Sequence, residues 1–501
     1  MWVSDKIGME DIGKWQGNIK VLLNADCGTG KTSFVLNELY EYVRERGWKI
    51  LYLSNRNLLK KQIELQIINK QDVFTLFNYQ KKEYDYRDIP WEDIRQTELA
   101  HAINEQYDMV VCDEAHYFFT DSWAGTTSNV MLQVICHLLT IPVIFMTATP
   151  SILQRYVSFN DENIFTVKKP PHVANARYYS NDEAIERIID TIPPDEKIIY
   201  FGRKTDRLLE LKAKYQDKCM FVCAESNKNF RKHVNIDERN YLIENSKFRP
   251  QILFTTNALD NGINIEDLQV KYIICDYPDW ITVKQCIGRK RFTSSPDDEI
   301  NLYIKIEPRM YHGLLTEKKK QLKDMLNYQE MDITEFATAY KAIFHDKGFV
   351  FTDQYKDIGD KPFLILDSVY HKTKYDVEFL ESIVGKRRTA FVEHLCVELG
   401  ISFEMFKCLE GELNYSDTTT KLESLVGKKL WKDEQKELSQ FFGTGLYRFK
   451  KDSRCNKLKG IKNFIREIKL DNIYEIISKQ GKNPKTGKKK KETYWMIKRK
   501  N

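Results

Sequence analysis

The fold of this chain is decided by an eight-residue stretch that follows a short apolar run at residues 20–24. It reads Ala25-Asp26-Cys27-Gly28-Thr29-Gly30-Lys31-Thr32. Small residues let backbone N–H groups close around an anion, and a helical pattern over residues 32–46 places the positive end of a helix at the same point. Lys31 is then expected to reach the β- and γ-phosphates of a nucleotide, and Thr32 to bind Mg²⁺. The stretch therefore predicts a phosphate loop, formed by all eight residues, with ATP and Mg²⁺ as its cofactors.

Apolar runs on both sides of this loop alternate with helical patterns. Strands are predicted at residues 20–24, 49–54, 109–112 and 143–147. Residues 130–150 form the most apolar window, but Gln133, His137 and Pro142 interrupt it. That window is interpreted as a buried helix followed by a buried strand, not as a membrane span. Strands that alternate with helices are typical of a parallel sheet covered on both faces.

The same pattern restarts after Pro170 and Pro171. Strands are predicted at residues 197–201, 219–223, 251–255, 272–275 and 301–306, with a helix at 205–215. Beyond residue 308 helices are predicted at 317–328, 333–344, 375–384 and 386–399. The pattern changes again at the end of the chain. It predicts a helix at 457–468, a strand at 472–479, a turn at 483–491 and a returning strand at 493–498. This order of elements resembles a winged-helix element.

Charge and cysteine usage limit the class of protein. Residues 441–501 carry nineteen Lys and Arg against five Asp and Glu, a net charge of +14, so the rest of the chain carries −8 of the total of +6. This basic end favours a polyanion partner, although lysine-rich ends also serve as solubilising tails. The ten cysteines include no CxxC pair, so neither a zinc nor an iron–sulfur site is predicted. With no signal-peptide pattern at the N-terminus, we expect a cytoplasmic protein without a membrane partner.

A second acidic motif follows the predicted strand at 109–112. It reads Asp113-Glu114-Ala115-His116. The carboxyl end of a parallel strand is where α/β proteins bind ligands, so these side chains are expected beside the phosphate loop. Asp113 is predicted to hold Mg²⁺ through water, and Glu114 to orient and activate the attacking water.

The phosphate loop and the acidic motif, in this order and spacing, resemble superfamily 2 helicases of the DEAH-bearing kind. Residues 147–150, which read Thr-Ala-Thr-Pro, look like the family's motif III, so the resemblance implies a coupling role for His116, Thr147 and Thr149. Residues 54–58 resemble motif Ia, which implies that Arg56 contacts the nucleic-acid backbone. Residues 78–80 are similar to the next strand-contacting element, and are equally well an ordinary loop.

The second half carries a matching set of motifs. Residues 285–291 read Gln-Cys-Ile-Gly-Arg-Lys-Arg and resemble motif VI, which implies catalytic roles for Gln285, Arg289 and Arg291. The usual final arginine would fall at Phe292, so Arg289 is the preferred γ-phosphate contact. Residues 255–265 look like motif V, with Asn264 where the family usually has Asp, which puts the role of that position in doubt. From motifs IV and V the resemblance implies nucleic-acid contacts by Arg203, Thr255 and Thr256 and a nucleotide contact by Gly262.

The resemblance, which covers residues 18–310, implies an α/β fold of two tandem RecA-like parallel-sheet domains, followed by a mostly helical C-terminal region that ends in a winged-helix-like element. The expected ranges are 1–165 (ATP-binding), 166–310 (second motor domain), 311–440 (helical accessory region) and 441–501 (basic nucleic-acid-binding end).

The function implied is an ATP-dependent helicase or translocase on single-stranded or forked DNA, in replication, repair or mobile-element metabolism alongside the proteins of those processes. The alternatives are an RNA helicase, an ATPase switch or remodeller that separates no strands, and a binding module with a degenerate motor.

Overall fold

The structure is a computed structural model of the 501-residue chain. It describes residues 2–54, 67–78, 93–121, 126–223, 227–256, 263–330, 335, 349–351, 363–444, 457–484 and 491–500. The contacts divide the chain into two compact units. Unit 1 comprises Met1–His172, Lys197–Ile300 and Glu307–Ile401, and unit 2 comprises Val173–Glu196, Asn301–Ile306 and Ser402–Asn501. The four ranges expected from the sequence remain a prediction.

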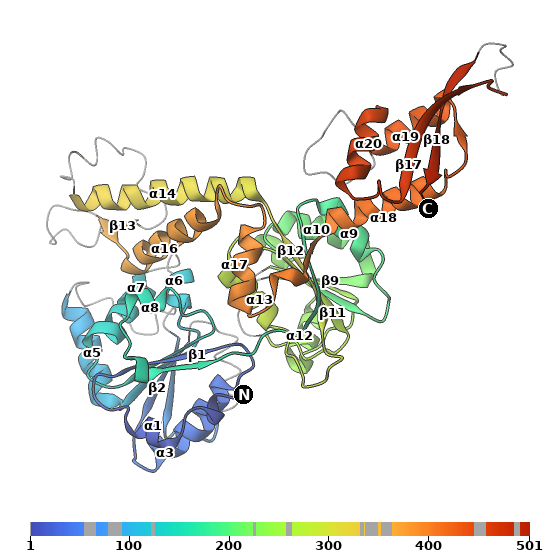
Figure 1. Ribbon diagram of the computed structural model, residues 1–501. Helices are drawn as coiled ribbons and strands as arrows, with labels where there is room; N and C mark the ends of the chain where they lie inside the picture. Colours follow the sequence, from blue (N-terminus) through green and yellow to red (C-terminus); the bar gives the residue numbers. More distant parts are fainter. Residues whose placement is uncertain are drawn as a thin grey trace. The chain divides into compact units, whose positions relative to one another are not determined.

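The first sheet of unit 1 has six parallel strands in the order β3-β2-β4-β5-β1-β6 (Figure 1). Their bounds are β1 (Lys20–Ala25), β2 (Ile50–Ser54), β3 (Phe74–Asn78), β4 (Met109–Cys112), β5 (Val143–Thr147) and β6 (Ile164–Val167). The four predicted strands are confirmed as β1, β2, β4 and β5. Because β5 lies between β1 and β4, the carboxyl ends of these three strands meet at one edge of the sheet.

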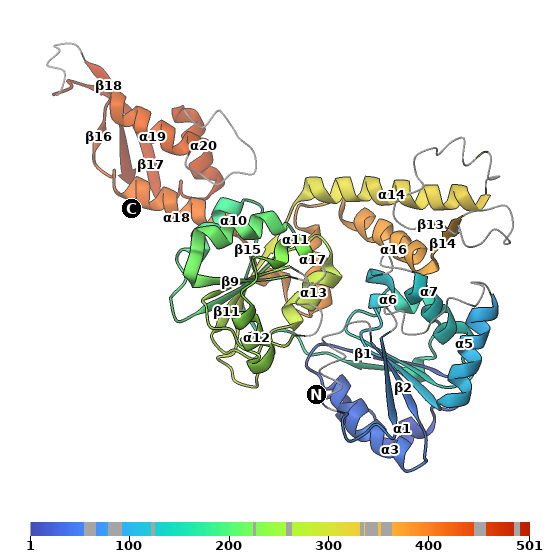
Figure 2. The same ribbon diagram turned by 180° about the vertical axis from the view of Figure 1, so that it is seen from behind.

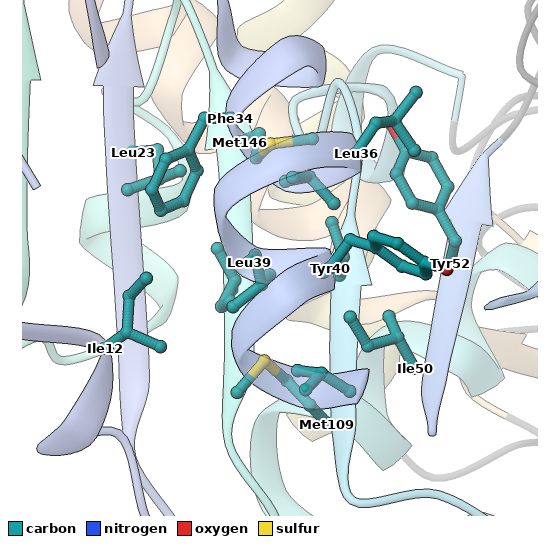
Figure 3. Packing of buried hydrophobic residues seen from close by; sticks show 14 of the residues in the cluster. Ile12, Leu23, Phe34, Leu36, Leu39, Tyr40, Ile50, Tyr52, Met109 and Met146 are labelled. Atoms are coloured by element: carbon teal, nitrogen blue, oxygen red, sulfur yellow. The ribbon is translucent and has the colours of Figure 1, made fainter. Parts of the chain in front are cut away.

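A helical segment after β1 covers this sheet. It consists of α2 (Lys31–Phe34), a π-helical turn (Val35–Leu39) and α3 (Tyr40–Arg44). Figure 3 shows Phe34 beside Leu23 of β1, and Tyr40 beside Ile50 and Tyr52 of β2. Apolar residues three to four positions apart give the segment one buried face. Burying a side chain of this size stabilises the fold by roughly 1.5–3 kcal/mol, so the packing holds the start of α2 in place.

The other helices of this part of unit 1 are short, apart from one. They are α1 (Met9–Gly13), α5 (Asp93–Gln106), α6 (Tyr117–Thr120), α7 (Thr126–Gln133) and α8 (Leu153–Tyr156). A π-helical turn at Val134–Leu138 continues α7. The predicted buried helix and strand at residues 130–150 are therefore confirmed.

Unit 1 contains a second group of parallel strands, in the order β11-β8-β10-β9. The bounds are β8 (Lys197–Gly202), β9 (Cys219–Val222), β10 (Ile252–Thr255) and β11 (Val270–Asp276), close to the predicted strands. The helices here are α10 (Thr205–Tyr215), α11 (Lys228–Arg231), α12 (Ile236–Asn245) and α13 (Trp280–Gly288). The two parallel-sheet α/β parts and the helical region after them confirm the predicted tandem RecA-like fold class.

The helical region of unit 1 contains α14 (Pro308–Glu330), α16 (Asp367–Ile383) and α17 (Ala390–Leu399). Figures 1 and 2 show α14 and α16 side by side, and Met325, Leu366 and Val369 form a small buried cluster there. A short antiparallel pair, β13 (Phe349–Phe351) and β14 (Phe363–Ile365), also belongs to unit 1. The helix predicted at 333–344 lies outside the described residues, apart from Glu335. Among the helices that the structure describes, none is long and apolar enough to cross a membrane.

Unit 2 joins three segments that are far apart in the sequence. Its strands β15 (Phe406–Cys408), β7 (Val173–Tyr179) and β12 (Ile300–Lys305) are neighbours in that order. The buried carboxylate of Glu410, at the start of α18 (Leu409–Glu423), accepts hydrogen bonds from the backbone N–H groups of Ser180 (2.6 Å) and Asn181 (2.8 Å). These bonds tie α18 to the start of α9 (Asp182–Ile189).

The rest of unit 2 is a helix and ribbon module. It contains α19 (Lys432–Thr444), α20 (Leu458–Glu467) and a three-stranded antiparallel sheet in the order β16-β18-β17, with β16 (Lys429–Leu430), β17 (Tyr474–Gly481) and β18 (Glu492–Arg499). The helix, strand and returning strand predicted for residues 457–498 are confirmed. One apolar cluster holds this module together, and it includes Leu438, Phe442, Phe464, Leu470 and Ile497.

Candidate active site

The predicted phosphate loop connects β1 to α2 and turns tightly. Gly28 has φ +74° and Gly30 has φ +83°, the left-handed region that favours glycine. A Cβ atom on Gly30 would lie 2.8 Å from the ring of Trp2, so a side chain there would clash as well. The sequence around these glycines therefore suits a loop whose backbone curls toward a ligand.

Lys31 begins α2 and its side chain lies inside the loop. The Nζ atom donates hydrogen bonds to the carbonyl oxygens of Ala25 (2.7 Å) and Asp26 (3.3 Å). Thr29 Oγ1 also donates to Asp26 O (2.7 Å). These bonds hold the buried ammonium group inside the loop, which lines the cavity described below.

The acidic pair follows β4 at the edge of the same sheet. Tyr52 of β2 donates its hydroxyl hydrogen to Asp113 Oδ2 (2.7 Å), and the N–H group of Glu114 donates to Asp113 Oδ1 (2.9 Å). Glu114 itself has φ +48°, a conformation that costs a non-glycine residue of order 1–3 kcal/mol. The Glu114 side chain approaches Arg289, which caps the end of α13.

The pKa values of the two buried carboxyl groups shift in opposite directions. Burial, followed by the charge of Glu114, raises the pKa of Asp113 to about 6, although its bond from Tyr52 opposes the shift. Burial also acts to raise the pKa of Glu114, but positive charges outweigh it and lower that pKa, those of Lys31, His116, Arg289 and Arg291. Glu114 is therefore the more readily ionised member of the pair.

The predicted coupling residues form a chain beside the acidic pair. His116 Nδ1 lies 3.1 Å from Thr147 Oγ1 and 3.5 Å from Glu114 Oε2. The N–H group of Thr149 donates to Thr147 Oγ1 (3.0 Å). All of these side chains except that of Glu114 are buried. The end of β5 is thus hydrogen-bonded to the acidic motif after β4.

The predicted arginines lie at and just after the end of α13, close to the phosphate loop and the acidic motif. Arg289, which is 4% exposed, places Nη2 3.7 Å from Glu114 Oε1 and donates to Gln285 Oε1 (3.2 Å). The thiol of Cys27, in the phosphate loop, lies 3.8 Å from the same Gln285 oxygen. Gln285 and Arg289 therefore reach both motifs of the first sheet.

Arg291 is held by the residue whose role the sequence put in doubt. Asn264 Oδ1 accepts hydrogen bonds from Arg291 Nε (2.9 Å) and Nη2 (2.5 Å), and Arg291 Nη1 donates to Gly288 O (3.0 Å). Nη1 also lies 3.5 Å from the place of a Cβ atom on Gly28. Burial lowers the pKa of Arg291, although a guanidinium stays charged at neutral pH. The neutral amide of Asn264 is thus sufficient to orient this arginine.

One cavity of about 670 Å³ joins these groups. Its walls include the phosphate loop residues Asp26, Cys27, Gly28, Gly30, Lys31 and Thr32, the acidic pair, and Arg289 and Arg291. Trp2, Lys169, Lys284 and Asn264 also line it. The motifs in the sequence predicted a site role for none of these last four. Lys284 has the clearest signal of them, since it lies directly before Gln285.

The proposed magnesium ligands lie together. The Tyr52 hydroxyl is hydrogen-bonded to the side chains of both Asp113 and Thr32. One carboxylate and one hydroxyl, completed by phosphate oxygens and water, suit the octahedral oxygen coordination of Mg²⁺. No group of three His, Cys, Asp or Glu side chains with metal-site geometry occurs within the described residues, and such a magnesium site needs none.

The predicted nucleic-acid contacts that the structure describes, Arg203, Thr255 and Thr256, are not among the residues that line this cavity. Arg203 follows β8 and places Nη2 3.8 Å from Glu307 Oε2. Thr255 ends β10, the strand beside β8, and its Oγ1 donates to Thr256 O (2.9 Å). Arg203 and the two threonines therefore lie at the carboxyl ends of neighbouring strands. Arg56, Tyr79, Gln80 and Gly262 lie outside the described residues.

Comparison with known proteins gives one family and several distant structures. Residues 4–152 match the family model described as "Type III restriction enzyme, res subunit", a helicase-family domain of superfamily 2. No curated protein matches the chain.

Three solved structures illustrate the distant similarities. S. cerevisiae Dbp5 bound to RNA and ADP BeF3 is 15% identical, with a TM-score of 0.39, and the alignment covers 58% of this chain and 79% of that chain. Mss116p bound to ssRNA and AMP-PNP is 14% identical over 78% of this chain and 88% of that one, with a TM-score of 0.42. The Escherichia coli DEAH/RHA helicase HrpB is 12% identical over 57% and 40%, with a TM-score of 0.38. The fold assignment depends on the strand order and the loop, not on these similarities.

Proposed function

We propose, from the premise that this chain is a superfamily 2 helicase-type ATPase through its residues 4–152, that it hydrolyses ATP to translocate on nucleic acid. The observation that carries this proposal is the approach of Arg289 to Glu114, 3.7 Å apart, in the cavity that Lys31 also lines. ATP hydrolysis needs positive charge on both sides of the leaving phosphate, and this cavity offers a lysine on one wall and arginines on the other.

The cavity's own residues supply the steps of hydrolysis. Glu114, ionised at neutral pH, orients the attacking water and accepts its proton. Lys31 and the N–H groups of the loop bind the phosphate oxygens, and Arg289, oriented by Gln285, stabilises the charge that develops on the leaving phosphate. Mg²⁺ held by Thr32 and Asp113 would neutralise charge on the β- and γ-phosphates.

The contacts of Glu114 connect the nucleotide site to the end of β5. A change at Glu114 reaches His116 directly, and His116 is bonded to Thr147 at the end of β5. Loss of the γ-phosphate also removes the anion that attracts Arg289 and Arg291. The arginines after α13 are then held less strongly to the wall formed by the phosphate loop and the acidic pair. A two-state motor requires such a difference in binding between its nucleotide states.

DNA is the proposed polymer, single-stranded or forked. The description of the matched family, a restriction enzyme subunit, supports DNA over RNA. An ATPase switch that remodels complexes without separating strands uses the same cavity, as does an RNA helicase. Replication or mobile-element proteins are the proposed partners.

The test measures ATP hydrolysis with no polymer, single-stranded DNA, duplex DNA and RNA in parallel, for the parent and for Lys31→Ala. We expect DNA to stimulate the parent most, and the variant to lose about 100-fold or more in rate while keeping its thermal unfolding midpoint. Parental hydrolysis by the variant would refute the assignment of the loop. Displacement of one strand from a tailed duplex then separates a helicase from a switch.

A further inference from the structure

Helix α20 in unit 2 has one apolar face and one basic face. Ile461, Phe464 and Ile465 are buried in the apolar cluster of the module. Three residues on the opposite side, Lys459, Lys462 and Arg466, are exposed, with Asn463 among them. Because residues three, four and seven positions apart share one side of a helix, these exposed side chains form a single face. The apolar side fixes the helix, so the basic face is presented rigidly to solvent.

The ribbon that follows α20 is basic as well. Figures 1 and 2 show the β17–β18 ribbon, drawn in red, extending past α19 and α20. Its described part carries exposed Lys479, Lys482, Lys491, Lys498 and Lys500. By contrast, α19 in the same module alternates its exposed charges, Lys432 and Lys436 with Asp433 and Glu437. Among the described residues of α19, α20 and the ribbon, the excess of positive charge therefore lies on α20 and the ribbon.

We infer that the basic face of α20, defined as Lys459, Lys462, Asn463 and Arg466, is a second nucleic-acid site that binds duplex DNA through the major groove, without ATP. It deepens the proposed function, on which it rests for taking DNA as the polymer. The lysines and Arg466 neutralise phosphates, and Asn463 is placed to reach a base edge.

The shape of the ligand follows from the shape of the site. The major groove of B-form DNA, about 12 Å wide, admits an α-helix. The corresponding groove of A-form RNA is deep and narrow, and side chains cannot read it. A straight, rigid helix also offers no aromatic platform on this face for the bases of a single strand, which such sites generally use. Duplex DNA is the polymer that fits.

The experiment compares two charge-reversal variants of the full chain. The test variant is Lys459→Glu with Lys462→Glu, and the matched control is Lys432→Glu with Lys436→Glu on α19, which makes the same change in net charge within the same module. Fluorescence anisotropy measures binding without nucleotide to a labelled blunt DNA duplex, to an RNA duplex of the same sequence and to single-stranded DNA, over a series of salt concentrations.

We expect the test variant to bind the DNA duplex about tenfold or more weakly, with the slope of log affinity against log salt reduced by about 1.8, or 0.9 for each lost phosphate contact. The control should change affinity less than about threefold. Unchanged duplex affinity in the test variant overturns the inference, and so does an equal loss in the control. An RNA duplex that binds the parent as tightly as DNA, and weakens equally, also overturns it.

The motor provides the readout that separates this inference from the proposed function. Hydrolysis stimulated by single-stranded DNA should be the same in the parent and both variants. If the parent hydrolyses no ATP, the proposed function fails while the duplex measurement still decides on α20. If hydrolysis is normal and duplex binding does not depend on Lys459 and Lys462, only the inference fails.

Discussion

Lys284 Nζ lies 2.9 Å from Asp26 Oδ1, and this buried ion pair joins α13 to the phosphate loop. The same ammonium group donates to Glu398 O (3.0 Å), near the end of α17. The other carboxylate oxygen of Asp26 accepts a hydrogen bond from the N–H group of Lys169 (2.9 Å). Both oxygens of a loop residue are thus held by elements outside the first sheet.

Lys284→Met should therefore affect nucleotide binding as well as stability. Removing one partner of a buried pair leaves the other charge uncompensated, which costs about 3 kcal/mol. We expect a lower free energy of unfolding and a raised KM for ATP, because Asp26 then loses its ion pair with α13 and the loop is held less firmly. Urea unfolding and steady-state hydrolysis measure the two effects. The control is Lys197→Met, which breaks a similar pair with Asp267 (2.8 Å) away from the cavity and should lower stability alone. Equal KM values in the two variants would contradict this role of Lys284.

Asn264 and Arg291 should behave as one functional unit. Since Asn264 Oδ1 holds two nitrogens of Arg291, Asn264→Leu should lower kcat/KM to nearly the same extent as Arg291→Ala. The double variant should then lose little more than either single variant, the non-additivity expected of direct partners. Arg289→Ala should lose more, about 1,000-fold in kcat, as the arginine nearest Glu114. Simple addition of the two single effects would show that Asn264 and Arg291 act separately.

The raised pKa of Asp113 predicts an acid limb in the pH profile. A carboxyl group must be ionised to hold Mg²⁺, and burial with the nearby charge of Glu114 raises this pKa to about 6. Hydrolysis should therefore fall as the pH drops through about 6, with Mg²⁺ at subsaturating concentration. Tyr52→Phe removes a hydrogen bond that favours the ionised form, so it should move this limb to higher pH. Saturating Mg²⁺ should move it to lower pH, and a limb that ignores both changes would contradict the assignment.

Local patterns were sufficient for the fold class and the principal motifs. Strands such as β4 and β5 are apolar runs, which are typical of parallel strands buried on both faces. The phosphate loop and the acidic motif could be placed because each directly follows such a strand. The edge strands β3 and β6 of the first sheet, and β7 of unit 2, were missed, because these strands are only partly buried and mix polar with apolar residues.

The missed site residues depend on tertiary contacts. Trp2 is 55% exposed and lies far from the other motifs in sequence, yet its ring covers Gly30. Tyr52 looks like an ordinary core residue of β2, and only the folded sheet brings its hydroxyl to Thr32 and Asp113. Asn264 departs from the family's usual Asp, and the structure was needed to show that it still orients an arginine.

The way α18 is tied down has a practical consequence for dissecting this protein. A stop placed after residue 401 would strip Glu410 from Ser180 and Asn181, and Asp417 from its bidentate partner Arg187. In such a shortened chain β7 and α9 would lack the segment against which they pack. We expect it to express poorly and to be cleaved readily by proteases. The C-terminal hundred residues therefore cannot be removed without disturbing β7 and α9. Surface substitutions will test the function of these residues more directly than shortened chains.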